Sequence, residues 1–210
     1  MSNGLGNRPG RALILTGLQR AYCDPRGDLA ARGSRVEVLA AVVSRAAALL
    51  ADARAAGAVV VHLVEAVLPA GRSDSPSWRR SRLRGATSVA TDLAAEIVPS
   101  LRPREDELVV ERYRLGGFID TRTEVLLRSN AVGTIILAGV ETHGSVLATA
   151  IEAAELDYDV FVAEDCVAAR DVRLHEVALD LLRIWTAVVP ARQCPLARAQ
   201  DRYGVAGGDS

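Results

Sequence analysis

Short runs of Val, Ile and Leu alternate with longer amphipathic segments along most of this 210-residue chain. Continuous apolar runs are typical of strands buried on both faces of a parallel sheet, and amphipathic segments are typical of the helices that cover such a sheet. The runs predict strands at residues 11–16, 58–64, 108–111, 134–140, 159–163 and 187–189. The segments between them predict helices at residues 36–56, 121–129, 145–156 and 175–185. We therefore expect a three-layer α/β/α fold with a six-stranded parallel sheet.

This pattern fits a single domain. We expect the domain to span residues 11–195, between a flexible N-terminus at residues 1–10 and a C-terminal tail at residues 196–210. Residues 69–87 are rich in Gly, Ser, Pro and Arg and predict a long loop. The loop carries Trp78, which is expected either to close over a pocket or to contact a second subunit.

The charge pattern excludes several classes of function. The formal net charge is −1, and the one basic cluster surrounds Trp78, so we expect a solvated loop there and no nucleic-acid surface. All 25 basic residues are Arg, which stays protonated at any working pH, so no amine can act as a neutral base. The exclusive use of Arg and the high Ala content suggest a GC-rich bacterial genome, and with it a role in specialised metabolism.

The cysteines and the apolar runs indicate where the protein resides. Cys23, Cys166 and Cys194 are odd in number and far apart, which favours a reducing compartment over a disulfide framework. No Cys/His spacing resembles a zinc site, and we expect no metal and no cofactor. Residues 1–10 lack the apolar run of a signal peptide, and no run is long enough to span a bilayer. We expect a cytoplasmic protein without a membrane partner.

Ligands of parallel α/β sheets bind beyond the carboxyl ends of the strands, near the point where the strand order reverses. The loops after Thr16, Glu111 and Val140 are therefore the places to search. Residues 137–150 read LAGVETHGSVLATA, a strand end followed by a turn and a helix that is predicted to begin at Ser145. The backbone N–H groups of such a helix start suit an oxyanion hole or a carboxylate site.

Four segments in the right order resemble the isochorismatase-like cysteine hydrolases. Gly139-Val140-Glu141-Thr142-His143-Gly144-Ser145-Val146, followed by Thr149-Ala150, is similar to the family motif G-V/I-x-T-x-x-C-V-x-x-T-A. Weaker similarities are found at residues 12–25, 109–121 and 158–165. The resemblance covers roughly residues 11–189 and implies the expected fold, a usual assembly as homodimer or homotetramer, and a cis peptide bond between Val140 and Glu141.

The resemblance also implies a catalytic triad, which this chain departs from at every position. The family has an Asp base, a supporting Lys and a Cys nucleophile, and the matching residues here are Gly17, Arg112 and Ser145. Gly17 has no side chain, and a Ser hydroxyl needs a base even more than a thiol does. Asp24 and Asp28 are conceivable substitutes for the Asp, although they fall in the outgoing loop.

The remaining candidate residues admit more than one interpretation. Ser145 is interpreted as a helix cap rather than a nucleophile, and His143 as a structural histidine bonded to the backbone rather than a general base. Arg112 and Arg114 either clamp a ligand carboxylate or pair with the acidic residues at 105–107. Cys23 is interpreted as a buried inert thiol rather than a displaced nucleophile. The residues predicted to line a substrate pocket are Arg114, Glu141, His143, Gly144, Phe118 and Tyr22.

Three hypotheses of function follow. The first is a pseudoenzyme that has lost cysteine-hydrolase chemistry but keeps a pocket for a small carboxylate or amide. The second is a repurposed enzyme, a non-cysteine hydrolase or lyase, in which Arg112, Arg114, Glu141, His143 and Asp24 would carry the chemistry. The third is a purely structural role in a homo-oligomer.

Overall fold

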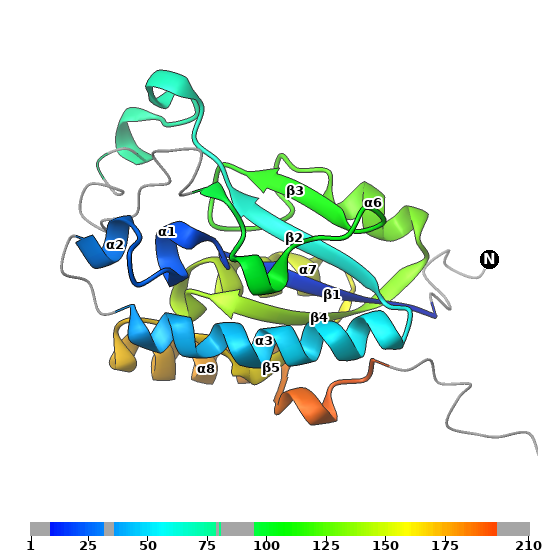
Figure 1. Cartoon of the computed structure of the whole chain (residues 1–210). Helices are drawn as coiled ribbons and strands as arrows, with labels where there is room; N and C mark the ends of the chain where they lie inside the picture. Colours follow the sequence, from blue (N-terminus) through cyan, green and yellow to red (C-terminus); the bar gives the residue numbers. More distant parts are fainter. Residues whose placement is uncertain (1–8, 32–35, 79, 81–94, 197–210) are drawn as a thin grey trace, which may run out of the picture.

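One parallel sheet of six strands organises the protein (Figure 1). The computed structural model describes residues 9–31, 36–78, 80 and 95–196. The expected C-terminal tail from residue 197, residues 1–8 of the expected N-terminal segment, and residues 79 and 81–87 of the expected loop lie outside these ranges. The strands follow the order β3-β2-β1-β4-β5-β6. Their bounds are β1 Gly10–Thr16, β2 Val59–Glu65, β3 Leu108–Arg112, β4 Val132–Val140, β5 Asp159–Ala168 and β6 Ala187–Val189.

Helices cover both faces of the sheet, so the predicted three-layer architecture is confirmed. Helix α3 (Glu37–Ala55) lies on one face, in front of the sheet in Figure 1. Helices α6 (Thr123–Ser129), α7 (Leu147–Glu155) and α8 (Val172–Trp185) pack on the other face. Successive side chains of a strand point to opposite faces, so in β1 Leu13 and Leu15 pack with α3, while Ala12 and Ile14 pack with the opposite helices.

The strand order reverses beside the central strand. The chain proceeds outward from β1 through β2 to β3 and then crosses to β4 on the other side of β1. The carboxyl ends of β1 and β4 are adjacent, because Thr16 pairs with Gly139. Two short helices that the sequence did not predict, α1 (Arg20–Cys23) and α2 (Asp28–Ala31), follow β1 at this edge. The switch point therefore lies between Gly17 and the end of β4.

Several predicted boundaries differ from those observed, two of them for identifiable reasons. Strand β5 continues to Ala168 rather than ending at residue 163, since its acidic residues Glu164 and Asp165 turn toward solvent. Helix α8 begins at Val172 rather than at residue 175, because the side chain of Asp171 caps it by accepting from the Leu174 N–H. Helix α7 begins at Leu147, two residues after its predicted start.

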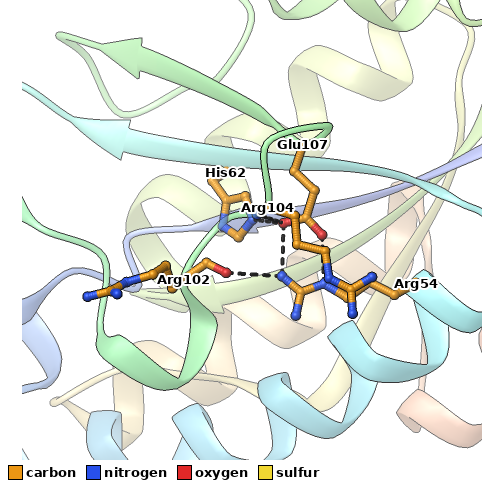
Figure 2. A network of polar contacts seen from close by, with 5 residues as sticks. All are labelled: Arg54, His62, Arg102, Arg104 and Glu107. Carbon is orange, nitrogen blue, oxygen red and sulfur yellow. Dashed lines mark hydrogen bonds and ion pairs between the residues drawn. The ribbon is translucent and has the colours of Figure 1, made fainter.

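A polar network ties α3 to the amino ends of β2 and β3, at the end of the sheet opposite the switch point (Figure 2). The Nε of Arg54 donates to Glu107 Oε1 over 2.6 Å, and its Nη2 donates to Glu107 Oε2 over 2.9 Å. His62 is only 2% exposed and places its Nε2 3.1 Å from the same carboxylate. Burial opposes ionisation of Glu107, but hydrogen bonds from Arg54, the Arg104 backbone and His62 outweigh it and lower its pKa to about 2.

Candidate functional site

The space at position 17 is filled by backbone. Gly17 adopts φ +68°, and its N–H donates to the Leu63 carbonyl over 3.3 Å. An ideal Cβ built on Gly17 would lie 2.0 Å from the carbonyl oxygen of Val140. Because real Cβ atoms do not approach a backbone oxygen so closely, any side chain at this position requires the end of β4 to move. The peptide bond between Val140 and Glu141 is cis, as the family resemblance predicts.

Ser145 is turned toward that same carbonyl oxygen. Its side chain is buried, and its Oγ donates to Val140 O over 2.8 Å. The interpretation of Ser145 as a helix cap is wrong, because the N-cap of α7 is Val146 and the Ser145 hydroxyl acts as a donor to a strand end. Among the described residues, no Asp, Glu or His accepts the Ser145 proton.

The turn between β4 and α7 is held from outside by residues that follow β5. Arg170 Nε donates to Glu141 Oε1 over 2.5 Å, and Thr142 Oγ1 lies 2.9 Å from Nδ1 of His175 on α8. His143 Nδ1 lies 3.6 Å from Glu141 Oε2 and has no hydrogen-bond partner, so the predicted bond from His143 to the backbone is not formed through this atom. Gly144 contributes its N–H to the Glu141 carbonyl over 3.0 Å.

Arg112 lies under the segment that follows β3. The side chain is 2% exposed, and its Nη1 donates to the Arg114 carbonyl over 2.6 Å, while its Nε has no hydrogen-bond partner. Burial lowers the pKa of the Arg112 guanidinium, and the nearby Tyr22 and Glu152 oppose this effect. A guanidinium remains charged despite such a shift, so Arg112 places a positive charge inside the protein.

The sequence offered two interpretations of Arg112 and Arg114, a clamp for a ligand carboxylate or pairing with residues 105–107. Arg114 fits neither of them. Its Nη1 donates to the carbonyls of Ser73 and Tyr113, over 2.9 and 2.7 Å, and its guanidinium lies 5.2 Å from the ring centre of Trp78. The two arginines therefore form no ion pair with residues 105–107, and Arg114 connects the end of β3 to the segment after β2. Trp78 covers Arg114 at this connection.

Two aromatic residues of the predicted pocket are packed rather than open. Phe118 is 7% exposed and packs against Tyr158, with 5.8 Å between the ring centres. Its N–H donates to Glu152 Oε2 of α7 over 2.8 Å. Tyr22 is 5% exposed, and its hydroxyl donates to the buried carboxylate of Glu65 at the end of β2. Both rings contribute more to enclosing the site than to an open surface for a ligand.

Cys23 and Asp24, which the sequence offered as a displaced nucleophile and as a substitute for the Asp, are differently placed. Cys23 is buried, and both burial and the nearby charge of Glu141 raise the pKa of its thiol to about 12, as expected of an inert thiol. Asp24 accepts from the Arg26 N–H over 2.9 Å and from Arg20 Nη2 over 3.1 Å, which lower its pKa. A thiol that remains protonated and a carboxylate held by surface cations are poor candidates for nucleophile and base.

The site thus places charges on both sides of an uncharged centre. Arg112 and Glu65 are register partners on β3 and β2, and Glu141 and Arg170 form an ion pair after β4 and β5, with Gly17 and the Ser145 hydroxyl between the two pairs. The sequence pattern did not mark four residues of this site, Glu65, Glu152, Arg170 and His175. Glu65 and Arg170 follow apolar strands directly, a signal that would have identified them.

Within the described ranges no three His, Cys, Asp or Glu side chains come together as a metal site. None of the helices in the same ranges is long and apolar enough to cross a membrane.

Comparison with known proteins places this chain in a family. The isochorismatase domain family matches residues 11–193. The chain is 30% identical over 176 residues to a maleamate amidohydrolase of Pseudomonas putida, covering 84% of this chain and 79% of that protein. It is also 30% identical over 182 residues to a ureidoacrylate amidohydrolase of Methylobacterium radiotolerans, covering 80% and 70%. A cysteine hydrolase structure from Pseudomonas syringae superposes with a TM-score of 0.81 at 23% identity, over 97% of this chain and all of that one, and so shares the fold. The match over residues 11–193 shows that this chain belongs to the isochorismatase family.

Proposed function

We propose that this chain has lost the cysteine-hydrolase chemistry of its relatives and retains a pocket for a small carboxylate or amide. The observation that carries the proposal is the double role of the Val140 carbonyl. This oxygen lies where a side chain at position 17 would begin, and it accepts the hydrogen bond of the Ser145 hydroxyl. A nucleophile must give its proton to a base during attack, and an amide carbonyl is far too weak a base to take it.

The charge at position 112 supports the same conclusion. Arg112 can stabilise negative charge, but its guanidinium cannot give up a proton to relay it, and its Nη1 is engaged by the Arg114 carbonyl. Losing cooperating catalytic groups removes several orders of magnitude of rate. The Arg112–Glu65 and Glu141–Arg170 pairs that flank the centre support a retained binding role for polar ligands.

The test is an ammonia-release assay on the purified protein with maleamate, ureidoacrylate and aromatic carboxamides. We expect no turnover above that of Ser145→Ala, and ligand binding detected as a rise in melting temperature. Turnover that disappears in Ser145→Ala would overturn the proposal. Ser129→Ala is the matched control, because Ser129 is an exposed serine on α6 whose hydroxyl also donates to a backbone carbonyl.

A second candidate function is a repurposed enzyme, which Glu141 and His143 favour. Glu141 is 9% exposed, and Nδ1 of His143 approaches it to 3.6 Å, so an acid and a base lie beside each other next to the Ser145 turn. In this case the reaction would depend on Glu141 and be independent of Ser145. Activity on the same amides that survives Ser145→Ala but is lost in Glu141→Gln would select this candidate.

We also propose that the protein forms a homo-oligomer in the cytoplasm. Helix α8 exposes Val177, Leu181, Ile184 and Trp185, which follow one another at helical spacing along one stripe. A second copy of this chain would cover that stripe. Light scattering after size exclusion is expected to give at least a dimer, which Leu181→Glu should dissociate, and a monomer at micromolar concentration would contradict the proposal.

A further inference from the structure

A cavity of about 270 Å³ lies at the end of the sheet opposite the switch point, beside the polar network of Figure 2. It is bounded by the first residues of β2 and β3 and by Gly57, which follows the carboxyl end of α3. Pockets for drug-sized ligands enclose about 300–1,000 Å³, so this cavity has the size of a smaller metabolite. The residues whose chemistry decides its occupant are Arg54, Arg104, Asp106, Val59 and Leu108.

Arg54 gives the cavity hydrogen-bond donors but little net charge. Its Nε and Nη2 donate to Glu107 and to the Arg102 carbonyl, whereas its Nη1 has no hydrogen-bond partner among the described residues. Glu107 is ionised at neutral pH, since its pKa is lowered to about 2, and both of its oxygens are engaged by Arg54. The pair is therefore close to neutral, and Nη1 is left for another acceptor.

Arg104 and Asp106 bring one charge of each sign to the same cavity. In the described part of the chain neither side chain forms a hydrogen bond or an ion pair. Figure 2 shows the Arg104 side chain extending from the loop before β3 toward Arg54. Hydrogen bonding to Glu107 and, more weakly, the charges of Glu107 and Asp106 raise the pKa of the Arg54 guanidinium against the effect of burial, so Asp106 lies within electrostatic reach of Arg54.

These charges decide between classes of ligand. A simple anion that reached Arg104 would be repelled by Asp106, and a simple cation that reached Asp106 would be repelled by Arg104. A molecule that carries both charges avoids either repulsion and gains both attractions. The carboxyl end of α3 adds partial negative charge beside Gly57, which favours the ammonium group of such a molecule on that side.

The rest of the lining used in this argument is apolar. Ala58 and Val59 at the start of β2, and Leu108 at the start of β3, line the cavity and are only partly buried. An apolar group of a ligand would remove their surface from water, which is favourable in proportion to the area buried. A polar group at the same place would lose its water without gaining a hydrogen-bond partner.

We propose that this cavity binds a free α-amino acid with an apolar side chain. Its carboxylate accepts from Arg104 and from Nη1 of Arg54, and its ammonium group donates to Asp106. Its side chain packs against Val59 and Leu108. The inference goes beyond the proposed function, because this cavity and the switch point lie at opposite ends of the sheet.

The test compares L-leucine with two molecules that each lack one of its charges. These are 4-methylpentanoate, which lacks the ammonium group, and isopentylamine, which lacks the carboxylate. We expect L-leucine to bind the full chain in calorimetric titration at least tenfold more tightly than either, and to raise the melting temperature by about 3–6 °C at about ten times its dissociation constant. Binding of a singly charged probe as tight as that of L-leucine, or no binding of L-leucine up to about 50 mM, would overturn the inference.

Arg104→Ala separates this cavity from every other place where the probe could bind. Because the Arg104 side chain has no partner among the described residues, the variant should melt within about 2 °C of the parent while its affinity for L-leucine falls at least tenfold. Arg102→Ala is the matched control, since Arg102 is an exposed arginine of the same segment that does not line the cavity. The control should keep both the melting temperature and the affinity. An affinity that is unchanged in Arg104→Ala, or that falls equally in the two variants, would contradict the assignment.

Asp106→Asn tests the ammonium end of the ligand. Removing this charge is expected to weaken the binding of L-leucine and to strengthen that of 4-methylpentanoate, so that the tenfold preference between the two probes disappears. A preference that survives the substitution would show that another group holds the ammonium, and would overturn the assignment. The proposed loss of hydrolysis is tested separately, by ammonia release and Ser145→Ala, so the failure of one proposal is distinguishable from the failure of the other.

Discussion

Substituting Gly17 by Ala tests whether the carbonyl of Val140 closes position 17. Gly17 has φ +68°, a conformation that costs a residue with a Cβ about 1–2 kcal/mol. The new Cβ would also lie 2.0 Å from Val140 O, where ordinary contacts begin at 3.4 Å, so the end of β4 has to shift. Forcing an extra methyl into a packed interior costs about 1–3 kcal/mol more, and weakening the bond from Ser145 about 1 kcal/mol. We therefore expect Gly17→Ala to lower the free energy of unfolding by about 3–6 kcal/mol in total.

Gly57→Ala provides the matched control for the backbone conformation. Gly57 has φ +63°, and a Cβ there would meet no atom within 4 Å. Its substitution should therefore cost only the conformational part, about 1–2 kcal/mol. Urea denaturation of both variants measures the difference, with unchanged slopes confirming that the comparison is valid. Equal losses in the two variants would refute the reasoning, because they would show that the carbonyl moves aside freely and that an Asp at position 17 has room.

Three further outcomes are expected. The free energy of unfolding should fall as the pH drops from about 4.5 toward 2, because Glu107 is held ionised in the fold with a pKa of about 2. Glu107→Gln should remove this pH dependence and lower the free energy of unfolding at neutral pH by up to about 3 kcal/mol. Acid titrations of the parent and the variant that superpose would contradict this expectation. The three buried cysteines, with thiol pKa values raised to about 12, should react with a disulfide reagent at pH 8 only after unfolding, so rapid labelling of the native protein would be inconsistent with their burial. Arg114→Ala should speed limited proteolysis after β2 severalfold, since it removes the bond to the Ser73 carbonyl, and an unchanged cleavage rate would show that this bond does not hold the segment.

The fold could be predicted from the sequence because strands buried on both faces of the sheet consist mostly of apolar residues. All six strands lie where runs of Val, Ile and Leu predict them. The end of β5 could not be predicted from the sequence, because Glu164 and Asp165 resemble the start of a loop. Only the pairing of β5 with β4 shows that these residues remain within the strand. Short helices such as α1 also escape prediction, because four residues carry too little periodicity to identify a helix.

The candidate site is predictable in its location but not in its orientation. The order of the motifs brings Gly17, Arg112 and Ser145 to neighbouring strand ends, because parallel strands end at the same edge. The direction of the Ser145 hydroxyl depends on where the backbone of β4 places one carbonyl oxygen, and no residue type encodes that position. Glu152 contributes from one turn further along α7, a relation that the sequence shows only once the helix is known.

The lengths of the strands also bear on how the chain avoids aggregation. The two outermost strands are the shortest, with five residues in β3 and three in β6, whereas β4 and β5 have nine and ten. Unpaired backbone groups at the edge of a sheet are templates for pairing with another molecule, and short edges offer few of them. Strand β3 also carries the exposed Glu111 near its end, which disfavours the approach of an apolar strand. The long apolar segments that build the core are thus kept away from neighbouring molecules in the folded state.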